Sequence, residues 1–182
     1  MVLTLFLVTL AASATLGFIY ELTKEPIAQA KLRKKNAAIQ KVVPRFTNQP
    51  NNESYQVAVE GDSLTLYPAK QDGKLVGVAV STFTTKGYSG EIRLMVGFNP
   101  DGTIHNISVL EHQETPGLGD KIEKSKSDWS RQFNGQQPGD FQVKVQKDGG
   151  DVDAITAATI SSRAYCDAVR RAYQAFQKGG LQ

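Results

Sequence analysis

A cluster of hydroxyl side chains stands directly before the last predicted helix of this 182-residue chain. Its four members are Thr156, Thr159, Ser161 and Ser162. Backbone N–H groups at a helix N-terminus lack intrahelical partners and carry a positive partial charge, so they favour an anion such as a phosphate. Ala157 and Ala158 leave room for that group beside the Thr159 hydroxyl. A plain helix cap formed by Thr159 or Ser161, with nothing bound, explains the same residues.

Two further stretches combine glycine with hydroxyl groups next to predicted strands, where sites tend to lie. In Glu114-Thr-Pro-Gly-Leu-Gly119, Pro116 and Gly117 predict a type II turn. Its two glycines would let a planar ligand lie against the backbone. A tight structural loop is the alternative. For Thr84–Gly90, which contains Gly-Tyr-Ser-Gly, the local pattern favours a turn between two strands.

Other chemistries find little support. The single cysteine, Cys166, excludes an internal disulfide and any multi-cysteine iron–sulfur or zinc site, and we expect it to be a packing residue. His105 and His112 suggest structural or exposed roles, and the carboxylates near His112 have a weak metal-ligand spacing. Walker and dinucleotide fingerprints are missing. A net charge of +3, without a broad basic face, argues against nucleic-acid binding.

Residues 1–20 are uncharged and predict a transmembrane helix, because a helix of that length spans roughly 30 Å. Tyr20 stands where an interfacial aromatic residue belongs. A secretory signal peptide is the alternative, since Ala12-Ser-Ala14 resembles a cleavage motif. The apolar run is long for such a peptide and no basic segment precedes it.

The segment 21–44 predicts an amphipathic juxtamembrane helix with Thr23 as its cap and Pro26 in its first turn. Pro44 ends it. Its basic residues follow the apolar span, so the positive-inside rule alone would place the remaining chain in the cytoplasm. We expect a short basic extension before Met1 to be missing, which weakens that argument.

Residues 45–182 predict one globular α+β domain with an antiparallel sheet. The strand candidates alternate or are rich in β-branched residues: Tyr55–Val59, Leu64–Pro68, Leu75–Phe83, Ile92–Phe98, Thr103–Leu110 and Phe141–Val145. Asn99-Pro-Asp-Gly102 predicts a hairpin turn. Short helical turns are expected within Asp120–Phe133, and a helix over Ser161–Lys178.

Together these motifs resemble the membrane-anchored FMN-binding subunits of ion-pumping respiratory complexes. The chain is most similar to the G subunit of the Rnf complex, and the C subunit of the sodium-pumping NADH:quinone reductase is a longer relative. The resemblance covers nearly the whole chain and rests on the order of several motifs: the N-terminal span, Glu21–Ile27, Gly87-Tyr-Ser-Gly90, Met95-Val-Gly-Phe98, Glu114–Gly119 and Asp153–Ser162.

In that family the last threonine of a Ser-Gly-Ala-Thr motif is esterified to the phosphate of FMN by a separate flavin transferase. The resemblance implies that Thr159 is this residue. Here Thr156 replaces the serine and keeps its hydroxyl, and Ala157 replaces the glycine and adds a methyl group where the phosphate must approach. The expected phosphate neighbours are Thr156, Ala157, Ala158 and Ser162. The expected ring or ribityl contacts are Glu114, Thr115, Gly117, Leu118 and Gly119, with Tyr88 as a weaker candidate.

The resemblance implies a covalent FMN-carrying electron relay in an ion-translocating ferredoxin:NAD oxidoreductase, with no turnover of its own. It also implies membrane and iron–sulfur partner subunits, a lipid bilayer around a single-pass span, and a globular domain on the extracytoplasmic side. Two alternatives stay open: a C-type subunit of the quinone reductase, and a cofactor-free, membrane-anchored binding or assembly module.

Overall fold

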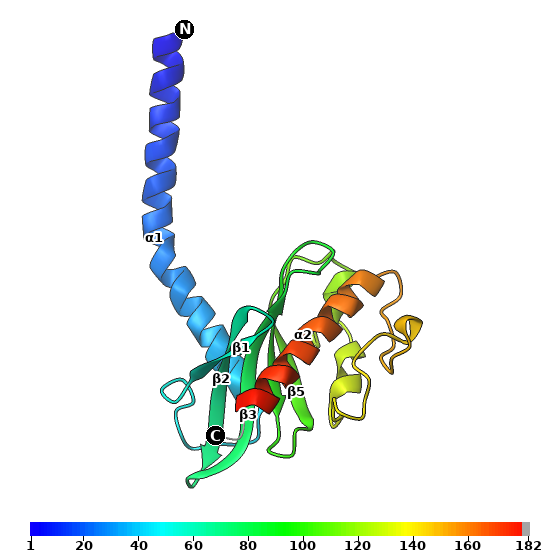
Figure 1. Ribbon diagram of the computed structural model, residues 1–182. Coiled ribbons are helices and arrows are strands. Elements are labelled where there is room, and N and C mark those ends of the chain that lie inside the picture. Colours follow the sequence, from blue (N-terminus) through cyan, green and yellow to red (C-terminus); the bar gives the residue numbers. More distant parts are fainter. Residues whose placement is uncertain (180–182) are drawn as a thin grey trace. The chain divides into compact units, whose positions relative to one another are not determined.

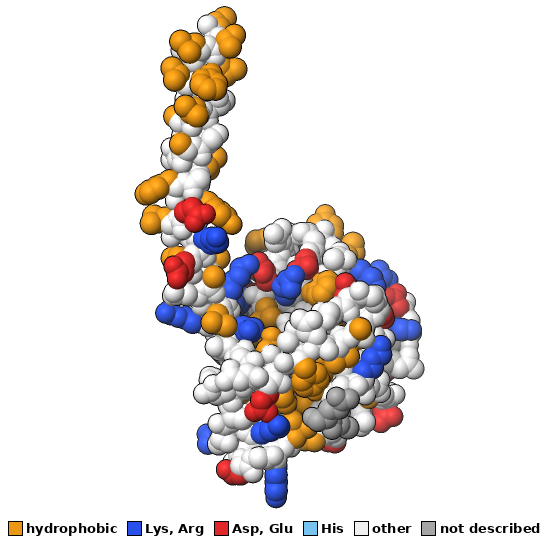
Figure 2. All heavy atoms as spheres, turned by 60° about the vertical axis from the view of Figure 1, so that its left-hand side comes forward, with side chains coloured by type: hydrophobic (Ala, Val, Ile, Leu, Met, Phe, Trp, Pro, Cys, Tyr) orange, Lys and Arg blue, Asp and Glu red, His pale blue; other side chains and the backbone are white. Residues whose placement is uncertain are grey.

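The computed structural model describes residues 1–179, which divide into two compact units after Asn36. The first unit is the larger part of helix α1 (Val2–Val42). By length and composition α1 can cross a membrane, and the part that qualifies has no buried residue. Figure 2 shows hydrophobic side chains along the first part of this helix and charged side chains further along it. The apolar helix predicted for residues 1–20 is therefore confirmed.

The second helix predicted to begin near Thr23 does not exist as a separate element. α1 continues through Thr23 and Pro26 without interruption. The Thr23 hydroxyl donates a hydrogen bond to the Ile19 carbonyl oxygen at 2.8 Å, which is a back-bond within the helix and not a cap. The prediction of a cap was wrong because residues on both sides of Pro26 favour helix and outweigh the loss of one N–H donor.

Five antiparallel strands form one sheet in chain order (Figure 1). They are β1 (Tyr55–Val59), β2 (Asp62–Gln71), β3 (Lys74–Thr84), β4 (Ile92–Phe98) and β5 (Ile104–Glu111). β2 is longer than predicted because two-residue turns join it to β1 and to β3. Both residues of each turn have positive φ, 52° and 88° at Glu60-Gly61 and 51° and 79° at Asp72-Gly73, as tight hairpins with strand twist require.

The prediction of a sixth strand at Phe141–Val145 is wrong. This segment is a loop, and its one sheet-like contact is an isolated parallel bridge between Val145 and Val152. Its alternating apolar residues arise from burial of Val143 and Val145 against the main core, without a neighbouring strand.

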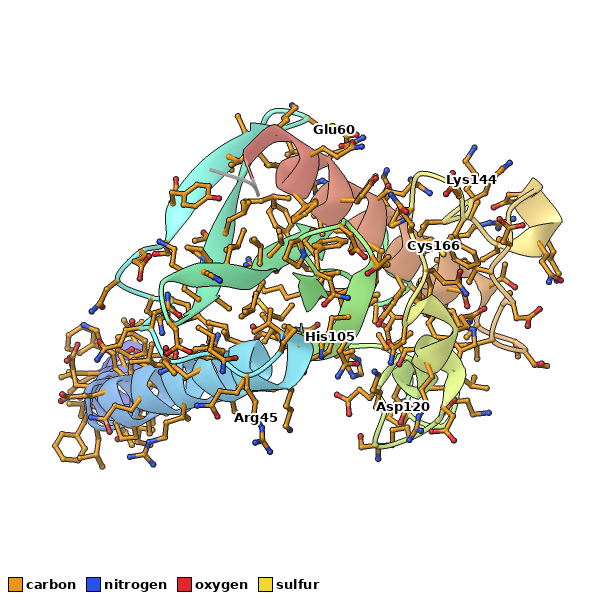
Figure 3. The ribbon with its side chains drawn as sticks, turned by 90° about the horizontal axis from the view of Figure 1, so that it is seen from below. Arg45, Glu60, His105, Asp120, Lys144 and Cys166 are labelled. Carbon is orange, nitrogen blue, oxygen red and sulfur yellow. The ribbon has the colours of Figure 1, made fainter. Side chains whose placement is uncertain are left out.

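The sheet has a hydrophobic core on each face, because successive strand residues point to opposite sides. One face packs against α2 (Thr159–Gly179) through residues such as Leu94, Val96 and Phe98. The other face packs against the last turns of α1, where Ile39 and Val42 meet Met95. Figure 3 shows the sheet between α2 and this end of α1. A Cβ atom on Gly97 would lie 1.7 Å from the Val42 carbonyl oxygen, so glycine permits this approach.

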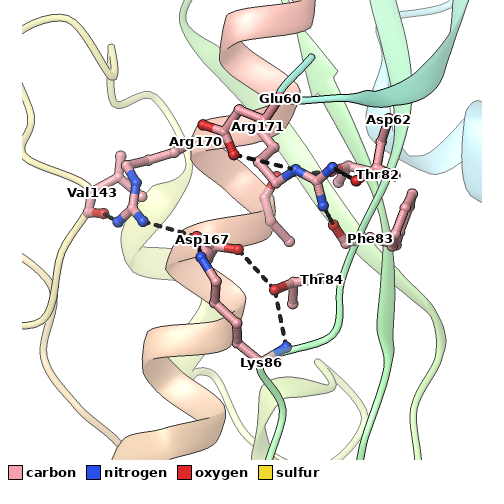
Figure 4. Close-up of polar contacts among 11 residues, drawn as sticks. Glu60, Asp62, Thr82, Phe83, Thr84, Lys86, Val143, Asp167, Arg170 and Arg171 are labelled. Carbon is pink, nitrogen blue, oxygen red and sulfur yellow. Dashed lines mark hydrogen bonds and ion pairs between the residues drawn. The ribbon is translucent and has the colours of Figure 1, made fainter. Parts of the chain in front are cut away.

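α2 begins two residues earlier than predicted and is tied to β3 by polar contacts (Figure 4). The Thr82 hydroxyl donates to the Ala168 carbonyl at 3.0 Å, and Arg171 donates to the Phe83 carbonyl at 2.7 Å.

The predicted short helical turns are confirmed as η1 (Gly119–Ile122) and η2 (Trp129–Phe133). A third short helix, η3 (Gln146–Asp148), follows them.

Candidate functional site

The three stretches singled out by their glycines and hydroxyls meet around one cleft of about 470 Å³. One stretch lies between β3 and β4, one follows β5, and one leads into α2. The residues that line the cleft are Tyr88, Glu114, Thr115, Leu118, Gly119, Ala157, Ala158, Thr159, Ile160 and Ser161. Loops that lie far apart in the sequence thus form a single site, from Tyr88 to Ser161.

The buried carboxylate of Glu114 joins these three loops. Its Oε1 atom accepts a hydrogen bond from the backbone N–H of Ser89 at 3.0 Å, and its Oε2 atom accepts one from the Ser161 hydroxyl. The backbone N–H of Glu114 donates to Nδ1 of His112 at 3.0 Å. Nε2 of His112 therefore carries the proton of the neutral ring and donates to Glu123 at 3.1 Å.

Two glycines permit the close packing around Glu114. A Cβ atom on Gly87 would lie 2.2 Å from the Gly90 carbonyl oxygen and 2.8 Å from Oε1 of Glu114. A Cβ atom on Gly119 would lie 2.7 Å from Oγ of Ser161 and 2.8 Å from Cβ of Glu114. Any side chain at either position would push the loops apart, so the geometry of the cleft depends on these residues.

The loop after β5 adopts the predicted type II turn. The Leu118 N–H donates to the Thr115 carbonyl at 3.1 Å, and Gly117 has a φ of 77° at the third position, as this turn requires. The turn presents Thr115 and Leu118 to the cleft and leaves Gly117 exposed at its tip.

The loop before α2 is held in place by η2. The Trp129 indole N–H donates to the carbonyl oxygen of Asp153 at 2.5 Å, and Gln132 accepts from the Asp153 N–H at 2.8 Å. The Trp129 ring also packs edge-on against Tyr165 of α2, with ring centroids 5.1 Å apart. These contacts fix the loop relative to the first turn of α2.

The hydroxyl groups at the start of α2 divide into two kinds. Ser162 is fully buried: its Oγ accepts from the Ile155 N–H at 2.9 Å and donates to the Ala158 carbonyl at 3.0 Å. Ser161 is also buried and is engaged by Glu114. Within residues 1–179, the hydroxyls of Thr156 and Thr159 have no hydrogen-bond partner, and only Thr159 lines the cleft.

Most of the predicted contact residues are brought together, and three are not. The cleft contains Thr159 and seven of the expected neighbours: Tyr88, Glu114, Thr115, Leu118, Gly119, Ala157 and Ala158. Gly117 and Thr156 are exposed beside it, and Ser162 is buried behind it. Ser161 does not cap the helix, since α2 begins at Thr159 and the Ser161 side chain turns to Glu114.

Sequence reasoning missed Ile160 and the role of Ser161 in the cleft. Ile160 is 47% exposed in the first turn of α2. A large apolar residue at an exposed helix start could have indicated a contact surface. No comparable sequence signal joins Ser161 to Glu114, because the two residues are 47 positions apart.

The cleft suits a ligand with a ring and a phosphate. Backbone N–H groups of the first turn of α2 lack intrahelical partners and favour an anion next to Thr159. Leu118, Tyr88 and Ile160 offer apolar surface for a planar ring. Among the described residues there is no group of three or more His, Cys, Asp or Glu side chains arranged to hold a metal ion.

The fold and this cleft define an FMN-binding domain, and the family model described as "FMN-binding domain" matches residues 87–174. The chain belongs to the family of the G subunits of ion-translocating oxidoreductase complexes. It is 42% identical to the G subunit of Erwinia tasmaniensis, over 90% of this chain and 85% of the relative. It is 38% identical to that of Salmonella typhi, over 93% and 86% of the two chains. It is 40% identical to the G subunit of Vibrio cholerae, over 85% of this chain and 78% of the relative.

Proposed function

We propose that this chain carries FMN in phosphoester linkage to the Thr159 hydroxyl and relays electrons as a subunit of an ion-translocating, Rnf-type oxidoreductase complex. The observation that carries the proposal is the position of Thr159. Of the four hydroxyls at the start of α2, it alone lines the cleft without a hydrogen-bond partner in the described chain. Family membership and the FMN-binding domain support the cofactor.

A covalent link suits the charges of the cleft. Among the described residues, its lining contains the Glu114 carboxylate and no lysine or arginine, so the helix N-terminus is what attracts a phosphate there. Such a partial charge contributes about 0.3–1 kcal/mol at an exposed site, which is too little to retain a soluble cofactor by itself. The bond to Thr159 would supply the retention, while the surrounding residues orient the ring.

A flavin exchanges electrons one or two at a time, and that is the chemistry the bound group would supply. The residues of the chain bind and orient it. Leu118, Tyr88 and Ile160 would contact the ring or its edge, and Thr115 and the Leu118–Gly119 backbone would contact the ring or the ribityl chain. Glu114 holds the three loops in register through Ser89 and Ser161.

In this proposal the chain works in a membrane, together with other subunits. The partners are the other membrane and iron–sulfur subunits of the complex, and a flavin transferase performs the attachment. α1 spans the lipid bilayer once, and the globular domain lies on the extracytoplasmic side. Because its carrier is tied to one residue, the chain passes electrons between neighbours and does not turn over a substrate alone.

Denaturing gel electrophoresis tests the attachment, because a covalent flavin stays fluorescent with its band. The wild-type chain, made in a host that has the transferase, is expected to fluoresce and to gain the mass of one FMN less water. Thr159→Ala is expected to abolish both signals. Thr156→Ala is the matched control, since Thr156 is an unpartnered threonine three residues away that lies outside the cleft, and it should keep them.

A non-fluorescent wild-type band would contradict the proposal. Fluorescence that persists in Thr159→Ala and disappears in Thr156→Ala would move the attachment to Thr156. Exposure of the extracytoplasmic side is tested separately by protease treatment of sealed, right-side-out membranes. Cleavage within residues 45–182 is expected, and protection would place the domain in the cytoplasm.

A further inference from the structure

A second cleft, of about 420 Å³, adjoins the cleft that contains Glu114 and Thr159, which we call the flavin cleft. Both clefts are lined by Ile160, in the first turn of α2. The charged residues of this second cleft are Lys86, Lys144, Arg163, Arg170, Asp148 and Asp167. Four cations against two carboxylates leave an excess of two positive charges. We call this surface the cationic cleft.

Carboxylates hold three of the four cations in place. Arg163 makes a two-pronged contact with Asp148, with both N–O distances 2.7 Å. Lys86 and Arg170 both reach Oδ1 of Asp167, at 2.8 Å and 3.1 Å (Figure 4). Asp167 is itself only 9% exposed. These three cations are therefore preorganised and lose little side-chain freedom on binding a partner.

The fourth cation, Lys144, is exposed, and its side-chain ammonium makes no hydrogen bond or ion pair among residues 1–179, although its charge acts on Asp148 from a distance. It lies in the loop between η2 and η3, at the same cleft as Cys166 of α2 (Figure 3). Lys144 supplies one of the two excess charges, and the other arises because Lys86 and Arg170 share the single carboxylate of Asp167. This arrangement fits carboxylate groups of another molecule better than it fits a purely internal ion-pair network.

The excess charge does not serve the flavin phosphate. The cations line the cationic cleft, whereas the lining of the flavin cleft contains none. The exposed side chain of Ile160 lies between the two and belongs to both. A partner that places carboxylates in the cationic cleft would also contact Ile160, and so would cover the mouth of the flavin cleft.

We propose that the cationic cleft docks an acidic segment of a neighbouring redox subunit of the same complex and so brings that subunit's electron carrier to the flavin cleft. The inference rests on the proposed function, because only a redox partner needs to approach the flavin. Electron exchange requires close approach of the two carriers. Complementary charge next to an apolar contact is a common means of fixing register between such partners.

Lys144→Glu tests the docking site in the complete complex, solubilised in a zwitterionic detergent with or without added anionic lipid and purified through a tag on another subunit. The measurement is the fraction of this chain retained as salt is raised. Lys144→Glu is expected to weaken retention about 2- to 10-fold, because it turns an attraction into a repulsion. Lys144→Arg keeps the charge and should behave like wild type. Lys147→Glu is the matched control, since Lys147 is exposed three residues away and outside the cleft.

Covalent flavin content is measured on the same bands. Normal flavin content with weaker retention of Lys144→Glu alone supports the proposal. Equal loss with Lys147→Glu, or no loss with either variant, overturns it. Loss of flavin in Lys144→Glu would assign the cleft to the transferase. An effect of Lys144→Glu seen only with anionic lipids would assign it to lipid headgroups. Absence of flavin from the wild-type chain would instead contradict the proposed function, so the two failures are distinguishable.

Discussion

Glu114 and Ser161 meet across the flavin cleft, where the Ser161 hydroxyl donates a hydrogen bond to Oε2 of the carboxylate. Both side chains are buried. The contact joins the loop after β5 to the first turn of α2, and the Ser89 N–H joins the loop before β4 to the same carboxylate. One acidic side chain therefore sets the relative position of all three loops.

Removing the hydroxyl from this contact is expected to weaken the site. Ser161→Ala leaves Oε2 of Glu114 buried without this donor, which costs about 1–3 kcal/mol of unfolding free energy. Ser125→Ala is the control, because Ser125 is exposed and bonds only to the neighbouring Glu123 side chain; its effect should stay within about 0.5 kcal/mol. Denaturant unfolding of the full chain in detergent measures both. Equal stabilities of the two variants would refute the role given to Ser161.

The close packing at Gly119 predicts that an added side chain there disturbs the cleft sterically. A methyl group there would meet Oγ of Ser161 at 2.7 Å and Cβ of Glu114 at 2.8 Å, and the second atom cannot rotate away. Gly119→Ala is expected to cost about 1–3 kcal/mol and to lower the covalent flavin yield, since the loops must separate. At Gly139 an added Cβ atom would meet only the Tyr173 hydroxyl, at 3.4 Å. Gly139→Ala should retain wild-type flavin fluorescence, and a similar loss in both variants would count against this packing of the cleft.

We predict that the stabilising contacts of Asp167 are lost at low pH. Burial alone would raise the pKa of Asp167, but the hydrogen bonds from Lys86 and Thr84 outweigh it, so that this pKa lies below its ordinary value. The contribution to stability is therefore complete above the unfolded-state pKa of about 4 and is lost as pH falls through the lowered folded-state pKa. Asp167→Asn is expected to cost about 1–3 kcal/mol at pH 7 and to flatten the stability profile below about pH 4. Unfolding curves over this pH range test it, and an unchanged acid limb would exclude the assignment.

We predict that the thiol of Cys166 is unreactive in the folded chain. It is 1% exposed, and burial raises the pKa of its thiol to about 12. Because the thiolate is the reactive form, alkylation by iodoacetamide at pH 8 is expected to be about 100-fold slower than in denaturant or more. The rate is measured by mass spectrometry with and without guanidinium. Comparable rates in both conditions would show that the cationic cleft opens to the sulfur in the folded protein.

Local sequence patterns predicted most of the helices and strands, but they did not predict the contacts between them. The Ile92–Phe98 strand has the predicted bounds because it is a nearly continuous apolar run with clear turn residues on both sides. Phe141–Val145 alternates apolar and polar residues as an edge strand would, but among the described residues no strand lies beside it, and only the folded chain shows this. The three site loops were predictable one by one from glycine and hydroxyl content. The Glu114–Ser161 contact and the position of Ile160 depend on tertiary packing, which no short stretch of sequence specifies.

The backbone at Ala157 has a conformation that glycine adopts more readily than alanine. Ala157 has a φ of 62°, in the left-handed region, where a residue with a Cβ atom is strained by roughly 1–2 kcal/mol. Ala157→Gly relieves that strain and loses about 0.4–1 kcal/mol through the greater freedom of the unfolded chain. We therefore expect the variant to be more stable by up to about 1 kcal/mol. The substitution also removes the Ala157 methyl group next to Thr159, so the covalent flavin yield should be equal or higher.

Thermal unfolding and in-gel fluorescence measure the effects of Ala157→Gly on stability and on flavin yield. Ala158→Gly is the control, because Ala158 is buried without a positive φ and its replacement should destabilise. A loss of stability in Ala157→Gly as large as in Ala158→Gly would show that the backbone strain at Ala157 is not relieved by glycine.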